Sequence, residues 1–214
     1  MSHHQGCVDW AAAAGAGVNF CWIKATEGWS GEDREFERNA AGSAEHGIER
    51  GPYHFWRFDV ADYQRQALHF IEHINRFAWD LPPALDLEDE RGPVGASQVK
   101  WAIEAIREQT GWTPVIYSGG WWLPKHNFNP DWLKEHWLWL ANYPQGYDQV
   151  PKGMDLPWQV AHPSFVDGDS VLVWQYTSCG DGRAHGTHSR GLDRNRTPDG
   201  MMLDELVRKI GSPR

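Results

Sequence analysis

Short apolar runs alternate along the chain with amphipathic stretches, and this alternation is the feature that most constrains the fold. One amphipathic stretch carries Ala67, Phe70, Ile71 and Ile74 at the i, i+3, i+4, i+7 spacing of a helix with one buried face. Strands that alternate with helices predict a mostly parallel sheet covered by helices. The predicted strands are residues 20–25, 51–56, 83–88, 114–118, 137–143 and 171–176, and further predicted helices lie near 33–46, 99–106 and 203–210.

Polar residues at the ends of these strands favour a barrel over an open sheet. An open dinucleotide-binding sheet needs a G-x-G-x-x-G turn after an early strand, and the sequence has none. A β/α barrel builds its site from polar residues at the C-terminal ends of several strands. Because eight complete βα units take about 250 residues and the chain has 214, we predict an irregular TIM-like β/α barrel, a single domain over residues 1–214. The strand-end polar residues are Lys24, Glu27, Tyr53, Asp86, Glu88, Tyr117, Tyr143, Gln175 and Asp193.

The charge balance and the cysteine content exclude several classes of protein. The chain has 20 Lys and Arg against 29 Asp and Glu, and the resulting net charge of −9 argues against a nucleic-acid partner. No apolar run approaches the roughly 18 residues of a membrane span, so we expect no membrane insertion. Cys7, Cys21 and Cys179 are odd in number and widely spaced, which argues against a disulfide framework. The sequence is still compatible with one disulfide between two of them.

The segment 85–90, Leu-Asp-Leu-Glu-Asp-Glu, is the most informative stretch of the chain. On a strand, Asp86 and Glu88 share one face, while Leu85 and Leu87 share the face that would meet the helices. Residues i and i+2 on a strand lie about 7 Å apart, close enough for the two charges to raise one pKa. A neutral acid beside an ionised carboxylate is what cleavage of a glycosidic bond requires. The alternative interpretation is a solvated acidic strand end.

Aromatic residues share this predicted inner face. Alternation along the strands directs Tyr53 and Phe55 one way, Tyr117 likewise, and Trp139 and Tyr143 in another inward row. Aromatic faces suit the C–H faces of sugar rings, while hydroxyls and amides recognise sugar hydroxyls. For most of the 14 Trp residues, core packing is the expected role. Together, the carboxylates and the aromatic rows indicate a carbohydrate substrate.

Several short motifs follow one another over nearly the whole chain. They are SHHQG at 2–6, VDW at 8–10, WIKATEG at 22–28, GPYHF at 51–55, LDLE at 85–88, VIYS at 115–118, LWLANY at 138–143, WQY at 174–176 and LDRN at 192–195. With these motifs in this order the chain resembles glycoside hydrolase family 25, the lysozymes of the Chalaropsis type. The resemblance implies a flattened, irregular β/α barrel that needs no cofactor. It also implies hydrolysis, with net retention, of the β-1,4 bond between N-acetylmuramic acid and N-acetylglucosamine in bacterial peptidoglycan.

The same resemblance assigns roles to residues of these motifs. Glu88 matches the general acid, Asp86 its partner in D-x-E, and Asp193 a further carboxylate of the active site. Asp86 would either attack the sugar directly or orient the substrate's own acetamido group, and a D-x-E arrangement on one strand fits the second route better. Lys24 would either hydrogen-bond the substrate or balance the acidic cluster. The residues matched to the saccharide groove are Lys24, Glu27, Tyr53, Phe55, Tyr117, Trp139, Tyr143 and Gln175.

One departure from the family pattern concerns the start of the chain. The family carries an Asp two residues before the Ser of the S-H-x-Q-G motif, and that position would precede Met1. We therefore expect weak or no turnover from the 214-residue chain, restored by an N-terminal extension that supplies an Asp-containing strand. Two alternatives follow: a degenerate module that binds saccharide without cleaving it, and a chitinase-like barrel. The D-x-x-D-x-D-x-E pattern of chitinases is absent, because Ala84 occupies one of its upstream Asp positions.

Metal binding and cellular location are the remaining expectations. His185 and His188 lie three residues apart, and His3 and His4 are adjacent, but none has carboxylate or Cys companions at the spacing of a zinc site, so we expect no metal. Residues 1–6 lack the features of a signal peptide, so the chain either starts in a cytoplasm or follows a removed leader. We expect a monomer that acts at the bacterial cell wall, secreted or released by a phage.

Overall fold

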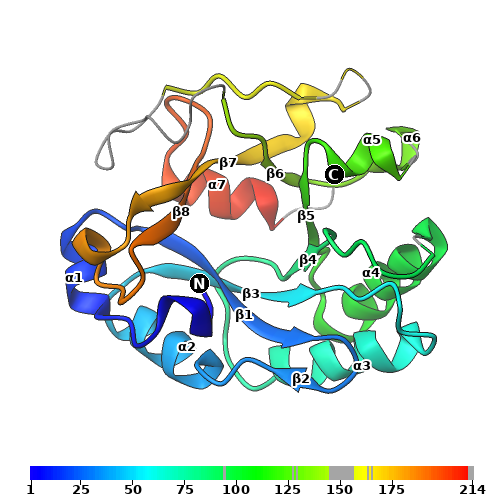
Figure 1. Cartoon of the computed structure of the whole chain (residues 1–214), viewed down its shortest axis with the longest axis horizontal. Helices are drawn as coiled ribbons and strands as arrows, with labels where there is room; N and C mark the ends of the chain where they lie inside the picture. Colours follow the sequence, from blue (N-terminus) through cyan, green and yellow to red (C-terminus); the bar gives the residue numbers. More distant parts are fainter. Residues whose placement is uncertain are drawn as a thin grey trace.

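A strongly curled sheet forms the centre of the computed structural model, which describes residues 1–93, 95–126, 128, 130–144, 157–162, 164 and 166–211 (Figure 1). Its strands are β1 (Phe20–Glu27), β2 (Gly31–Glu32), β3 (Glu49–Phe55), β4 (Ala84–Asp86), β5 (Val115–Gly119), β6 (Leu138–Ala141), β7 (Val171–Asp181) and β8 (Gly191–Arg196). Within the described residues they are arranged in the order β2-β1-β3-β4-β5-β6-β7-β8. The inner pairs, from β1–β3 to β6–β7, are parallel, and the outermost pairs are antiparallel. The predicted irregular β/α barrel therefore takes the form of a half-barrel.

Helices cover the outer face of this sheet and one of them closes its inner side. The α-helices are α1 (Trp10–Gly15), α2 (Phe36–Glu45), α3 (Tyr63–Ile74), α4 (Ala96–Thr110), α5 (Trp122–Lys125), α6 (Pro130–Leu133) and α7 (Leu203–Ile210). Short 3-10 helices are η1 (His3–Gln5), η3 (Gly168–Ser170) and η4 (Arg183–His185). Helix α7 lies near the middle of Figure 1, on the concave side of the sheet. No helix in the described part of the chain is both long and apolar enough to cross a membrane.

The predicted strands and helices are confirmed, and the differences lie mainly at their ends. β4 has only three residues, so Glu88 lies beyond its C-terminal end and not within it. The segment that carries the LDRN motif forms strand β8, which pairs antiparallel with an extended β7. Helices α1, α5 and α6 and strand β2 were not predicted, because elements of two to six residues are too short to show a hydrophobic period.

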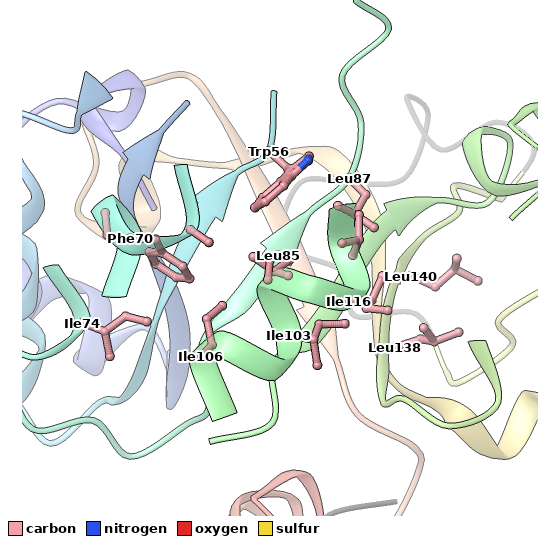
Figure 2. Packing of buried hydrophobic residues seen from close by; sticks show 14 of the residues in the cluster. Trp56, Phe70, Ile74, Leu85, Leu87, Ile103, Ile106, Ile116, Leu138 and Leu140 are labelled. Carbon is pink, nitrogen blue, oxygen red and sulfur yellow. The ribbon is translucent and has the colours of Figure 1, made fainter. Parts of the chain in front are cut away.

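The larger hydrophobic core lies between the sheet and the outer helices (Figure 2). Leu85 of β4 and Leu87 just after it have no exposed surface and pack in this core with side chains of α3 and α4, such as Phe70 and Ile106. Burial of a leucine of this kind contributes about 1.5–3 kcal/mol. The two leucines thus fix which face of β4 meets the helices. Asp86, which alternates with them, is directed to the opposite face.

A second, smaller core fills the inner side of the half-barrel. It joins Trp22 of β1, Val115 of β5 and Trp139 of β6 to Leu206 and Ile210 of α7. The apolar face of α7 therefore supports one end of the concave side. The polar residues at the C-terminal ends of the strands remain above this core, where they surround a cavity.

Candidate active site

One register row of the sheet brings together residues from five strands. Glu27 of β1 is the register partner of Phe55, Phe55 of Asp86, Asp86 of Tyr117, and Tyr117 of Trp139. Residues in one row of a parallel sheet project to the same face at the same height. All five were predicted site residues, and the row places them side by side near the C-terminal edge of the sheet.

Three carboxyl groups meet at a cavity of about 610 Å³. Asp86, Glu88 and Asp193 all line it, and so do the predicted groove residues Tyr53, Tyr117, Trp139 and Gln175. Asp86 is buried, with 7% of its surface exposed, and its Oδ1 atom has no hydrogen-bond partner among the described residues. Glu88 is only half-buried. The structure therefore provides a deep carboxyl group with a free acceptor beside a shallower one that faces the cavity.

Glu88 owes its position to backbone bonds made by its neighbour. The Leu87 amide donates to Tyr117 O at 2.9 Å, and the Ser118 hydroxyl donates to Leu87 O at 2.8 Å. These bonds hold the chain against β5 after β4 has ended. Glu88 is thereby kept next to Asp86 although it lies outside the strand.

The pKa values of the three carboxyl groups are all raised. Burial, followed by the charge of Glu88, raises the pKa of Asp86 well above its usual value. Burial and the charge of Asp193 raise the pKa of Glu88 to about 7, against the lowering effect of a hydrogen bond with Tyr117. Burial also raises the pKa of Asp193, and the amino group of Met1 opposes that rise. The cluster therefore retains a proton near neutral pH, as acid catalysis requires.

A network of aromatic and amide side chains lies beside these acids. The hydroxyls of Tyr117 and Tyr143 donate to Oε1 of Gln175 at 3.0 and 2.7 Å. Nε1 of Trp139 donates to Oδ1 of Asn195 at 2.7 Å, and the Trp139 ring stacks on Trp22 with centroids 4.8 Å apart. These contacts fix the orientation of the rings before any ligand binds. Asn195 was not among the predicted site residues, although it belongs to the LDRN motif.

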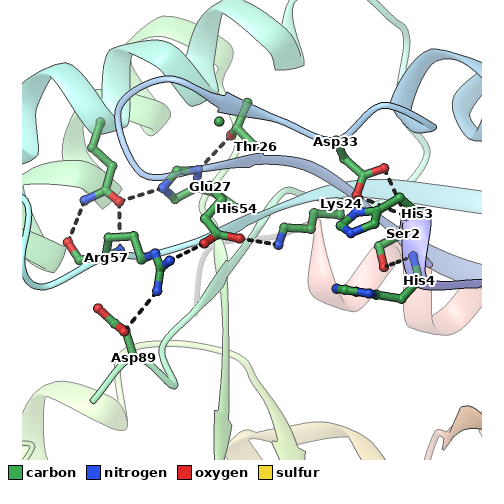
Figure 3. Close-up of polar contacts among 12 residues, drawn as sticks. Ser2, His3, His4, Lys24, Thr26, Glu27, Asp33, His54, Arg57 and Asp89 are labelled. Carbon is green, nitrogen blue, oxygen red and sulfur yellow. Dashed lines mark hydrogen bonds and ion pairs between the residues drawn. The ribbon is translucent and has the colours of Figure 1, made fainter. Parts of the chain in front are cut away.

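A chain of ion pairs extends from the site along its rim (Figure 3). Lys24 Nζ donates to Glu27 Oε2 at 2.6 Å, and the other oxygen of Glu27 lies 2.6 Å from Arg57 Nη2. Arg57 also contacts Asp89 at 3.3 Å, and Arg91 donates to the same Asp89 oxygen at 2.8 Å. The ammonium group of Lys24 lowers the pKa of Asp86. These contacts support a balancing role for Lys24 toward the acidic cluster.

A buried histidine network holds Arg57 in this rim. The backbone amide of Arg57 donates to Gln66 Oε1 at 2.8 Å. This amide oxygen can only accept hydrogen bonds, so His54 Nε2, which lies 3.1 Å from it, must be the donor. His54 Nδ1 then accepts from the Thr26 hydroxyl at 2.7 Å. Burial lowers the pKa of His54 to about 3, which keeps the ring neutral. His54 and Arg57 were not predicted as site residues, since alternation along β3 directs His54 away from the cavity and Arg57 lies past the end of that strand.

The remaining expectations concern metal ligands, cysteines and the start of the chain. Among the described residues, no group of three His, Cys, Asp or Glu side chains is placed to hold a metal ion. Cys7, Cys21 and Cys179 are free thiols. Met1 lies beside β1, where its amino group donates to Trp22 O at 2.6 Å and its carbonyl accepts from the Lys24 amide at 2.8 Å. The expected effect of an aspartate before Met1 stays a prediction.

Comparisons with known proteins agree with this geometry. Residues 1–185 match the model of the family described as Glycosyl hydrolases family 25. The N,O-diacetylmuramidase of Chalaropsis sp is 33% identical over 171 residues, which cover 72% of this chain and 81% of that protein. The uncharacterized protein YegX of Escherichia coli O157:H7 is 32% identical over 169 residues, which cover 74% of this chain. The aligned part is 59% of YegX, so the chain spans less than two thirds of that relative.

A solved structure shows the same fold. The crystal structure of the bacterial lysozyme from Streptomyces coelicolor matches with a TM-score of 0.80 at 24% identity, covering 99% of this chain and 94% of that one. This likeness confirms the predicted irregular, TIM-like α/β fold. Because the family model covers most of the sequence as well, the chain belongs to glycoside hydrolase family 25.

Proposed function

We propose that the chain is a muramidase that acts on bacterial peptidoglycan at the cell wall. It would hydrolyse the β-1,4 bond between N-acetylmuramic acid and N-acetylglucosamine with net retention. The observation that carries this proposal is the pair of adjacent carboxyl groups, Asp86 and Glu88, in an aromatic-walled cavity where burial keeps a proton near neutral pH. The muramidase named among the relatives supports the same substrate.

Glu88 is suited to protonate the leaving sugar. It is the more exposed of the two carboxyl groups, so its proton can reach an oxygen atom in the groove. Its pKa of about 7 leaves it largely protonated at mildly acidic pH. As the glycosidic C–O bond breaks, Glu88 would transfer its proton to the departing oxygen and become a carboxylate.

Asp86 is suited to orient the substrate's acetamido group. Its unpartnered Oδ1 atom is a buried acceptor that an acetamido N–H can reach from the cavity. The acetamido oxygen would then attack the anomeric carbon from the face opposite the leaving group. Water, deprotonated by Glu88, would open the cyclic intermediate and restore the original configuration. Direct attack by Asp86 gives the same stereochemistry, and a glycosyl adduct trapped on Asp86 would establish that route instead.

The experiment that tests the proposed function compares the 214-residue chain with a chain carrying an added Asp-containing strand before Met1. Such an addition would continue along β1, because Met1 already pairs with Trp22 and Lys24 in the parallel manner. We expect turbidity of a peptidoglycan suspension to fall faster with the extended chain. Mass spectrometry should find new reducing ends on N-acetylmuramic acid. Binding of cell walls without new reducing ends from either chain would contradict the proposal, and cleavage of chitin alone would indicate a chitinase.

The rate of cleavage should fall as the pH rises through about 7. Glu88 loses its proton in that range, and a deprotonated Glu88 cannot donate to the leaving oxygen. Because the charge of Asp193 contributes to the raised pKa of Glu88, Asp193→Asn should move this decline to lower pH. Initial rates from pH 4 to pH 9 at constant ionic strength measure both effects. A decline that stays in place in Asp193→Asn would argue against coupling of the two groups.

A further inference from the structure

A second cavity of about 390 Å³ lies outside the catalytic cavity and shares no lining residue with it. It opens at the C-terminal ends of β1 and β3, and the side chains that matter here are Lys24, Glu27, Trp29, Arg57, Asp59 and Arg91. Its position follows the ion-pair rim shown in Figure 3. The mechanism of bond cleavage uses none of the groups beyond Lys24, so the cavity needs a separate explanation.

Trp29 lines this cavity, and a cation–π contact restricts the orientation of its ring. Trp29 is 45% exposed, and the guanidinium of Arg65 on α3 lies over its ring at 4.2 Å from the centroid. Contacts of this kind contribute about 0.5–1 kcal/mol at exposed sites and restrict the ring. Gly28, with φ +59°, provides the left-handed turn that brings Trp29 to the rim. The part of the ring that Arg65 leaves uncovered is available to a ligand.

The charges around this cavity favour a neutral ligand. Four acidic side chains, Glu27, Glu32, Asp33 and Asp59, and three basic ones line it. Several of them are already paired with each other, as in the contacts of Glu27 with Lys24 and Arg57. An anionic peptide would meet no net positive charge here. A polyhydroxylated ligand, in contrast, can donate to the carboxylates and accept from the guanidinium and ammonium groups without disturbing the charge balance.

One register row links the two cavities, because Glu27 lines the second cavity and Asp86 lines the first. Phe55 is the register partner of both Glu27 and Asp86, so the row from Asp86 to Glu27 spans two strand spacings, or about 10 Å. Lys24 Nζ and Arg57 Cζ lie over the Phe55 ring at 5.2 and 5.3 Å. A linear ligand whose reacting bond lies over Asp86 can therefore continue across Phe55 toward Trp29.

We propose that the second cavity is a distal subsite for a neutral N-acetylated sugar of the same glycan strand, stacked on the uncovered face of Trp29. This inference rests on the proposed function, because it assumes that the strand is anchored at Asp86 and Glu88. The subsite would make binding depend on the length of the glycan, because long glycan strands reach Trp29 and short ones do not.

Trp29→Ala tests the subsite, with Trp121→Ala as its matched control. Trp121 is also exposed, at 56%, has Lys125 over its ring, and lines neither cavity described above. On long peptide-free glycan strands we expect Trp29→Ala to raise KM about five- to tenfold with kcat unchanged, as loss of one aromatic contact implies. KM for strands of a few sugars should stay within about twofold, and Trp121→Ala should stay within about twofold on both substrates.

Three outcomes would overturn the proposal. They are an unchanged KM on long strands, an equal rise of KM on long and short strands, and a rise confined to strands that still carry their peptides. The last outcome would assign the cavity to the peptide. Calorimetric binding of peptide-free strands to both variants keeps the test independent of turnover. If the chain binds long strands more tightly through Trp29 while neither it nor the N-terminally extended chain cleaves them, the subsite stands and the proposed function fails.

Discussion

In the chain extended by an Asp-containing strand, Glu88→Gln should lower the rate of peptidoglycan cleavage by about 10²- to 10⁴-fold, the usual contribution of a general acid. Glutamine keeps the shape of the side chain and removes the transferable proton, so binding of cell walls should stay within about threefold. Turbidity and reducing-end assays measure the rate, and a cell-wall pull-down measures binding. We expect the loss to be in kcat, because the proton is needed only as the glycosidic bond breaks.

Glu90→Gln is the matched control for this variant. Glu90 lies two residues further along, is exposed, and pairs with Lys125 and His126 on the protein surface. Its substitution removes the same charge without touching the cavity, so activity should stay within about twofold. Turnover of Glu88→Gln within tenfold of the wild-type rate would remove Glu88 as the acid.

Glu88→Gln should also be more stable than the wild-type chain at alkaline pH, by about 3 kcal/mol in the free energy of unfolding. The pKa of Glu88 is about 7 in the folded protein against 4.5 for an unperturbed side chain. Between these values the folded state holds one proton more than the unfolded state, so wild-type stability falls as the pH rises through this window. Glutamine has no proton to lose, so the difference between the two proteins should grow from pH 4.5 to pH 7 and then level off.

Urea unfolding of both proteins at a series of pH values measures this difference. Comparing the two proteins cancels the contributions of groups that Glu88 does not influence, such as the neutral His54, whose lowered pKa acts in the opposite direction. Glu90→Gln is again informative, because Lys125 lowers the pKa of Glu90 and its loss should cost a little stability at neutral pH. Equal stability of Glu88→Gln and wild type at pH 8 would show that Glu88 is not held in a desolvated site.

The sequence predicted the fold and the inward direction of Asp86 because both follow from local alternation. Leu85 and Leu87 are apolar and Asp86 is not, so burial of one face decides the direction of all three. The inward row of Tyr117 and Trp139 follows from the same pattern in β5 and β6. These predictions needed no knowledge of which strands pair.

The position of Glu88 and the rim around Arg57 could not be predicted in this way. Glu88 lies past the end of β4, where alternation no longer applies, and bonds from Leu87 to β5 place it. Arg57 depends on a buried amide, Gln66, on the next helix. Arg57, which follows β3, then contacts Glu27 at the end of β1 and Asp89 in the loop after β4. These contact partners are determined by how whole helices and strands pack together, and the periodicity of the sequence does not indicate that packing.

The register row from Glu27 to Trp139 determines which insertions and deletions this protein can accept. A residue inserted within β4 would shift its alternation by one, so that a leucine would enter the cavity and the carboxylate of Asp86 would enter the apolar core. Lengthening the segments that follow the strands leaves the row intact, because register is fixed within the sheet. Natural variation in length should therefore concentrate after Gly28, Asp89 and Gly119, where it can reshape the groove without moving the acids.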